Sequence, residues 1–132
     1  MKQLVFMKAA LLPAVTLGLV LAGACATVSG AEEGFRSIFN GKDLTGWQGN
    51  PKLWYVQDGA IVGRRTSADP VKQNTFLIWT NGTVADFELR LTYRIASGDA
   101  QGFGNSGIQY RSKVFDLAKF IVGGYQADIE VG

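Results

Sequence analysis

Two acidic residues near the end of the chain have a spacing that suits chemistry on sugars. Asp128 and Glu130 are separated by one residue, so in an extended strand both side chains point to the same face. At a rise of 3.3–3.4 Å per residue they lie about 6.6–6.8 Å apart. This separation falls within the roughly 6.5–9.5 Å between the two carboxyl groups of inverting glycosidases. Neighbours on one strand need not flank one bond, however, so the spacing alone is a weak indicator.

A second polar strand is predicted at Ser106–Arg111. Its Gln109 and Arg111 point to one face and its apolar side chains point to the other. If this strand neighbours the one at Tyr125–Val131, the polar faces form a single patch whose amides, Arg and acids could grip several hydroxyl groups. The alternative is the ordinary solvent-facing side of an antiparallel sheet. The compact amides favour a site, as does the preceding glycine-rich loop Gly102–Gly107, where backbone can approach a ligand.

Short strands are the elements that must position these side chains. The dipeptide Asp58-Gly59 lies between two apolar runs and predicts a tight hairpin. From Asp86 to Ile95 apolar and polar residues alternate, which predicts a strand with one buried face. The residues expected to be buried together there are Phe87, Leu89, Leu91, Tyr93 and Ile95. Six or seven strands joined by glycine-rich turns predict an all-β sandwich, with the segment around Val114–Ile121 left unassigned.

The charge balance and the missing residue types exclude several function classes. The chain has 13 basic and 11 acidic residues, and the first 31 residues contain two of the basic ones, Lys2 and Lys8, and no acids. The remainder is therefore neutral, which disfavours nucleic acid as a partner. Histidine is absent, so this chain has no His-based triad and no His metal ligand. Cys25 is the only cysteine, so an intrachain disulfide cannot form.

Residues 1–31 are predicted to be an export signal. Lys2 and Lys8 precede an apolar run from Ala9 to Ala26, and small residues follow. The rival interpretation, a membrane-spanning helix, is weakened by the proline and glycines within the run. Cleavage after Ala26 or Ala31 fits the small-residue rule, and a lipoprotein signal ending at Cys25 is a further alternative. We expect an exported bacterial protein that is periplasmic, extracellular or anchored to the outer membrane, with membrane contact only through lipid at Cys25.

Four blocks of the sequence, in this order, resemble the 3-keto-disaccharide hydrolase domain family. The blocks are 35–47 (FRSIFNGKDLTGW), 54–63 (WYVQDGAIVG), 105–111 (NSGIQYR) and 124–129 (GYQADI). The resemblance covers about residues 34–132 and implies a concanavalin-like jelly-roll β-sandwich. The family's domain carries on with further strands after the fourth block. Residues 32–132 are therefore expected to be the N-terminal part of a truncated domain.

The resemblance also implies a hydrolase that acts on 3-keto glycosides (3-keto-disaccharides) by elimination and hydration. A ketone at C3 acidifies the C2 proton, so a base can remove it while the glycosidic oxygen leaves C1, and water then adds. This route needs a general base and stabilisation of an enolate. Two alternatives stay open: a non-catalytic carbohydrate-binding module with the same fold, or an inactive fragment. A module would bind sugar without forming product.

The resemblance and the polar strands together assign the site residues. We place the catalytic roles on Arg111, which is always charged and could stabilise an enolate oxygen, and on Asp128, which suits an acid that holds the ligand or a metal. The residues expected to bind substrate are Gln109, Gln126, Glu130, Asn105, Ser106 and Trp79. Trp79 could stack on a sugar ring, although core packing is the commoner role of a tryptophan. No cofactor is evident from the sequence, and whether a divalent metal takes part stays open.

Overall fold

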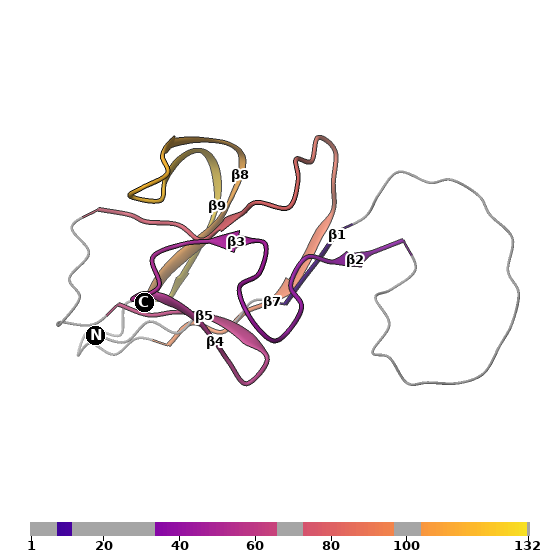
Figure 1. Ribbon diagram of the computed structural model, residues 1–132, viewed down its shortest axis with the longest axis horizontal. Helices are drawn as coiled ribbons and strands as arrows, with labels where there is room; N and C mark the ends of the chain where they lie inside the picture. The colour runs from indigo at the N-terminus through magenta and orange to yellow at the C-terminus, as the bar shows by residue number, and fades with distance from the viewer. Residues whose placement is uncertain (1–7, 12–33, 66–72, 97–103, 132) are drawn as a thin grey trace, which may run out of the picture.

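The computed structural model describes residues 8–11, 34–65, 73–96 and 104–131 (Figure 1). About half of these residues lie in strands and none lies in a helix, so the prediction of an all-β fold is confirmed for these ranges. The strands are β1 (Lys8–Leu11), β2 (Arg36–Ser37), β3 (Trp47–Gln48), β4 (Trp54–Gln57), β5 (Ala60–Gly63), β6 (Ile78–Trp79), β7 (Leu89–Thr92), β8 (Gly104–Asp116) and β9 (Ile121–Val131). In the described ranges, no helix is long and apolar enough to cross a membrane.

The hairpin of β4 and β5 forms around the turn that the sequence predicts. Asp58 has a φ of 51° and Gly59 a φ of 72°. Positive φ at both central residues is typical of the primed turns whose twist matches two antiparallel strands. The register pairs Trp54 with Gly63 across the two strands.

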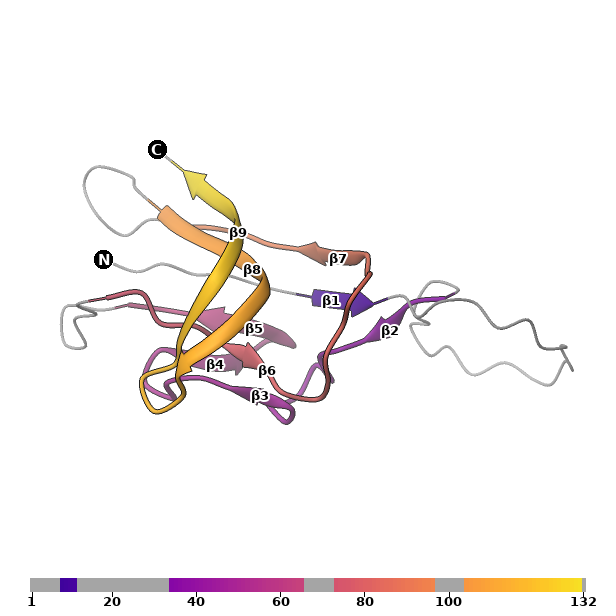
Figure 2. The same cartoon turned by 90° about the horizontal axis from the view of Figure 1, so that it is seen from above.

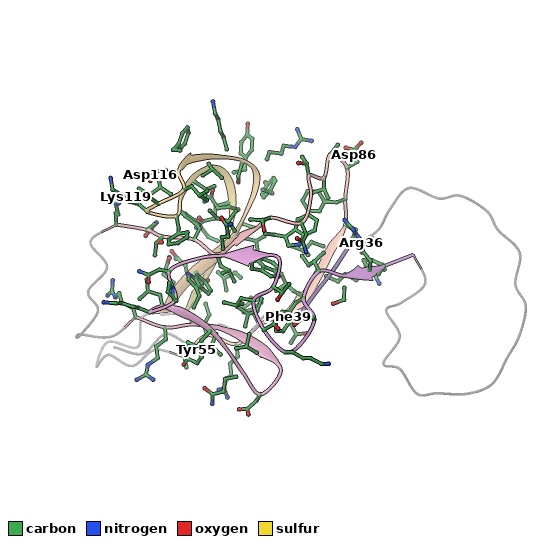
Figure 3. All side chains as sticks on the ribbon, viewed as in Figure 1. Arg36, Phe39, Tyr55, Asp86, Asp116 and Lys119 are labelled. Atoms are coloured by element: carbon green, nitrogen blue, oxygen red, sulfur yellow. The ribbon has the colours of Figure 1, made fainter. Side chains whose placement is uncertain are left out.

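Strand β5 lies at the centre of the core. All four of its residues are buried, and Ile61 and Val62 have no exposed surface. The indole ring of Trp54 lies against Gly63, because a β-carbon on Gly63 would be only 2.5 Å from the ring atom Cζ3. Phe39 is also buried, and Figure 3 shows it low in the middle of the molecule. An apolar strand covered on both sides thus supports the strands around it.

The first of the four family-like blocks builds a loop that is held together by its own side chains. Asn40 Oδ1 accepts a hydrogen bond from the backbone N–H of Lys42 at 2.8 Å, and Asn40 Nδ2 donates to Asp43 Oδ1 at 2.8 Å. Hydrogen bonds from Thr45 and Asn40 lower the pKa of Asp43 from 3.8 to about 2. Asp43 therefore acts as a structural acceptor that shapes the chain's entry into β3.

Strand β1 lies between β2 and β7 and pairs with both in the antiparallel sense. The three strands form one small sheet, which contains a piece of the segment predicted to be an export signal.

Strand β7 is shorter than the alternating pattern predicts. Leu89 and Leu91 are half-buried, but Phe87 is 37% and Tyr93 49% exposed, so the prediction that all five apolar side chains are buried together is wrong for these two. Both rings lie outside the stretch Leu89–Thr92 that pairs with β1. Alternation predicts which face a side chain takes, but burial also needs a neighbouring layer to cover that face.

Strands β8 and β9 form the longest element, a curved hairpin that Figure 2 shows most clearly. The segment left unassigned from the sequence is the end of β8, the turn and the start of β9. Within the turn, Lys119 Nζ lies 3.1 Å from Asp116 Oδ2 (Figure 3). The backbone N–H of Phe76 donates to the carbonyl oxygen of Phe120 at 3.0 Å, which ties the turn to the segment before β6.

Candidate functional site

A row of polar side chains lies along one face of the β8–β9 hairpin. The antiparallel register sets Asn105 opposite Glu130 and Gln109 opposite Gln126, with Asp128 between the two pairs. Since side chains alternate along each strand, all five point to the same side of the sheet. The prediction that the two strands are neighbours is therefore confirmed, and their amides and acids lie on one side of the hairpin. We call Asn105, Gln109, Gln126, Asp128 and Glu130 the polar face.

Hydrogen bonds join the members of the polar face. Asn105 Nδ2 donates to Glu130 Oε1 at 2.7 Å, and Gln109 Nε2 donates to Gln126 Oε1 at 3.1 Å. Gln126 Nε2 donates in turn to Asp128 Oδ1. The two glutamines are half-buried, whereas Asp128 and Glu130 are exposed. The carboxylates can thus meet a ligand from solvent, while the amides beside them are held in place.

Gly107 leaves the space that Gln126 needs. A β-carbon at position 107 would lie 2.8 Å from both Cγ and Nε2 of Gln126, and 2.9 Å from the carbonyl oxygen of Ala127. The last of these contacts is to backbone, which cannot swing aside. Any larger residue at position 107 would therefore displace Gln126 from Asp128.

A β-bulge interrupts β8 just beyond Gln109. The register shifts there, so that Arg111 and Ser112 together lie opposite the single residue Gly124. Arg111 has a φ of 48°, the left-handed conformation that a glycine usually supplies in this kind of bulge. The sequence pattern predicted that Arg111 and Gln109 point to the same face. The bulge interrupts the alternation of side chains at Arg111, so the pattern no longer determines its face.

The bulge brings Ser112 to the polar face. Its Oγ donates to Gln109 Oε1 at 3.4 Å. Gly124 permits this arrangement, because a β-carbon there would lie 2.7 Å from Ser112 Oγ and 2.8 Å from Ser112 Cα. Sequence reasoning missed Ser112. The signal that could have found it is the Gly123-Gly124 pair, since glycine within a strand often marks a bulge or a close backbone approach.

Two of the predicted substrate-binding residues lie elsewhere. Ser106 pairs with Ile129, whose side chain is buried, and so belongs to the opposite face of the hairpin. Trp79 lies in β6 and pairs with Trp47 of β3. The guanidinium carbon of Arg36 is 5.5 Å from the centroid of the Trp79 ring, a cation–π contact that covers part of the indole. Neither Ser106 nor Trp79 belongs to the polar face.

Apart from Ser106, the opposite face of the hairpin is apolar, and its side chains are buried at one end and exposed further along. Ile129 is buried at one end. Further along, Tyr110 and Tyr125 stack on each other with ring centroids 5.8 Å apart, and Tyr125 is 65% exposed. One sheet thus has a polar side and an aromatic side.

The side chains of the polar face offer hydrogen bonding and proton transfer. Within the described part of the chain, no three His, Cys, Asp or Glu residues gather closely enough to hold a metal ion.

The polar face and its bulge lie inside a region that matches a known family. Residues 34–132 match the family described as 3-keto-alpha-glucoside-1,2-lyase-like domain. The chain belongs to this family. The four sequence blocks that resemble the 3-keto-disaccharide hydrolase domain family all fall within the matched residues, so that resemblance is confirmed. No curated protein and no solved structure shows a significant match to the chain.

The backbone conformation of Arg111 leads to a stability prediction. An L-residue in the left-handed region costs roughly 1–2 kcal/mol relative to the right-handed one, and glycine avoids that cost. Arg111→Gly is therefore expected to be more stable than Arg111→Ala by about 1 kcal/mol, measured by urea unfolding of the two variants. Lys113 is the matched control, because it lies in β8 beyond the bulge and its φ is not positive. At position 113 the Ala variant should be more stable than the Gly variant. The same order of stability at positions 111 and 113 would contradict the left-handed conformation of Arg111.

Proposed function

We propose that this chain cleaves 3-keto glycosides on the polar face of the β8–β9 hairpin, by elimination followed by hydration. The observation that carries the proposal is a continuous row of hydrogen-bonding side chains within the residues that match the family. The description of the family names a 1,2-lyase acting on a 3-keto-α-glucoside. An elimination between C1 and C2 is the reaction that such a name describes.

The proposed reaction has two steps. In the first, a base takes the proton from C2, the electron pair of the C2–H bond forms a C2–C3 double bond, and the ketone becomes an enolate. The enolate then collapses to a ketone, a C1–C2 double bond forms, and the glycosidic oxygen leaves C1 with its electron pair and takes up a proton. In the second step, water adds its oxygen to C1 and a proton to C2. The protein must supply a base and stabilise the enolate.

Asp128 and Arg111 take the catalytic roles in this proposal. Asp128 is an exposed carboxylate with Oδ1 held by Gln126. In place of the ligand-holding role expected from the sequence, its Oδ2 accepts the C2 proton in this proposal. Arg111 is exposed at the bulge beside the polar face, and its positive charge opposes the negative charge that develops on the sugar. Asn105 and Glu130, bonded to each other at the far end, hold hydroxyl groups of the substrate.

The test is turnover of a 3-keto-disaccharide in D2O, followed by NMR of the product. Elimination and hydration place deuterium on C2, whereas direct displacement at C1 leaves the original hydrogen there. Asp128→Asn should lower turnover by at least about 100-fold, since general base catalysis contributes roughly 10²–10⁴-fold. Asp116→Asn is the matched control, because Asp116 is the last residue of β8 and pairs with Lys119 of the hairpin turn, and it should keep normal turnover.

Two results would contradict the proposal. Product that keeps hydrogen at C2, after correction for exchange without enzyme, would exclude the elimination. Normal turnover by Asp128→Asn would show that a group other than Asp128 is the base.

The stacked tyrosines favour a second candidate function, a non-catalytic carbohydrate-binding module. Tyr125 is 65% exposed beside Tyr110, and an exposed aromatic ring is a surface on which an apolar sugar face can pack. A module would bind the 3-keto-disaccharide without forming product, and Tyr125→Ala would weaken that binding while Asp128→Asn would not.

We also propose that the protein is exported and that residues 1–31 are removed, or cut before a lipidated Cys25. Processing would take away β1 and leave the edges of β2 and β7 without the strand that lies between them in the full chain. Intact mass of the protein recovered from a bacterial envelope fraction should show a missing N-terminus or a lipid adduct. Met1 retained on protein in the cytoplasm would contradict export.

A further inference from the structure

The hydrogen bonds on the polar face run in one direction. Ser112 Oγ donates to Gln109 Oε1, Gln109 Nε2 donates to Gln126 Oε1, and Gln126 Nε2 donates to Asp128 Oδ1. Each glutamine thus accepts through its oxygen from one side and donates through its nitrogen to the other. We call these four residues the relay.

The carboxylate at the end of the relay fixes the orientation of both amides. A carboxylate only accepts hydrogen bonds, so the atom of Gln126 that faces Asp128 must be Nε2. Gln126 Oε1 then faces Gln109 and requires a donor there, which is Gln109 Nε2. Gln109 Oε1 is left facing Ser112, whose hydroxyl must donate. Neither amide can rotate by 180° without placing two acceptors, or two donors, against each other.

One N–H hydrogen on each amide remains for a ligand. An amide nitrogen carries two hydrogens, and the relay uses only one from Gln109 and one from Gln126. The two residues are directly opposite in the register and half-buried, and Gln109 Nε2 lies 3.1 Å from the amide oxygen of Gln126, so the two amides adjoin and each has a fixed direction. N–H donors that are already oriented before the reaction are the groups that stabilise a developing oxyanion.

We propose that the side-chain N–H groups of Gln109 and Gln126 bind the C3 oxygen of the 3-keto sugar, and that Ser112 is a positioning residue that fixes them. This inference rests on the proposed function. In this inference the two amides recognise the ketone, while the positive charge of Arg111 lies at the bulge beside them.

The chemistry of the C3 oxygen explains why fixed donors suit it. A ketone oxygen only accepts hydrogen bonds, and it becomes negative when the C2 proton leaves, because the electron pair of the C2–H bond moves into the enolate. Donors that are already oriented bind this oxygen more tightly as its charge grows. An unoxidised sugar carries a hydroxyl at C3, which gains no charge, so the amides distinguish the oxidised substrate from its parent.

The experiment replaces Gln109 and compares two sugars. Gln109→Met keeps the length of the side chain, removes the N–H donors and leaves the bond between Gln126 and Asp128 intact. The kcat for the 3-keto-disaccharide should fall about 100-fold, as for loss of one oxyanion donor. The Ki of the unoxidised disaccharide as a competitive inhibitor should rise by no more than about 2–10-fold, the effect of losing one neutral hydrogen bond. Gln57→Met, in the exposed end of β4, is the matched control and should change neither constant.

Ser112 is tested separately as a positioning residue. Ser112→Ala should lower kcat by about 2–10-fold, the effect of one neutral hydrogen bond, and Ser112→Thr should restore it because the hydroxyl returns. If Gln109→Met fails to fold, Gln109→Glu replaces it, because this substitution keeps the shape and exchanges the donor for an acceptor.

The outcomes separate this inference from the proposed function. If the wild-type chain turns over the 3-keto-disaccharide but both Gln109 variants keep its kcat within about threefold, the inference is overturned and the proposed function stands. A Gln109 variant that lowers the kcat for the 3-keto-disaccharide and raises the Ki of the unoxidised disaccharide by the same factor would also overturn the inference, since equal effects indicate a general structural defect. If the wild-type chain gives no turnover, both proposals fail together.

Discussion

Antiparallel pairing sets Gln109 directly opposite Gln126, although 17 residues separate them in the chain. This register is the constraint on which the candidate site depends. A shift by one residue would turn every polar side chain of one strand to the other face. The buried Ile129 opposes such a shift, because it would then be exchanged for a charged neighbour on the core side of the hairpin. Burial of Ile129 thereby fixes which side chains form the polar face.

Close backbone approach is the second requirement, and glycine provides it twice. Gly107 lets Gln126 lie across β8, and Gly124 lets Ser112 approach from the bulge. The bulge holds Arg111 in a left-handed backbone conformation, which is less favourable for an L-residue by roughly 1–2 kcal/mol. Strained backbone of this kind persists where the surrounding pairing determines it, and it recurs at functional sites. The paired strands on both sides of the bulge supply that support here.

The sequence predicted the parts of this site that depend on alternation. Period-two patterning placed Gln109, Gln126, Asp128 and Glu130 on one face, because the side chains of a strand point alternately to its two sides. The pattern did not predict the bulge, because Arg111 itself carries no sign of a left-handed conformation, and the one signal was the Gly123-Gly124 pair on the opposite strand. Ser112 was missed for the same reason.

Other differences between sequence and structure come from contacts across the chain. The hairpin turn after β8 lacks the Asn-Gly or Asp-Gly signal that identified the turn at Asp58. Tyr93 follows the alternating pattern but lies beyond the paired part of β7, so it is exposed. The conformation of this turn and the exposure of Tyr93 both depend on which distant segment of the chain packs nearby, and the local sequence pattern does not contain that information.

The central claim is that the polar face of the β8–β9 hairpin binds a 3-keto glycoside through its side-chain amides. The most direct measurement is two-dimensional NMR of the side-chain NH2 groups of 15N-labelled protein during titration with a 3-keto-disaccharide. The account predicts saturable shifts of the Gln109 and Gln126 NH2 signals, with the Gln57 signals unchanged. Shifts confined to another part of the molecule, with both glutamines unaffected at saturation, would contradict it.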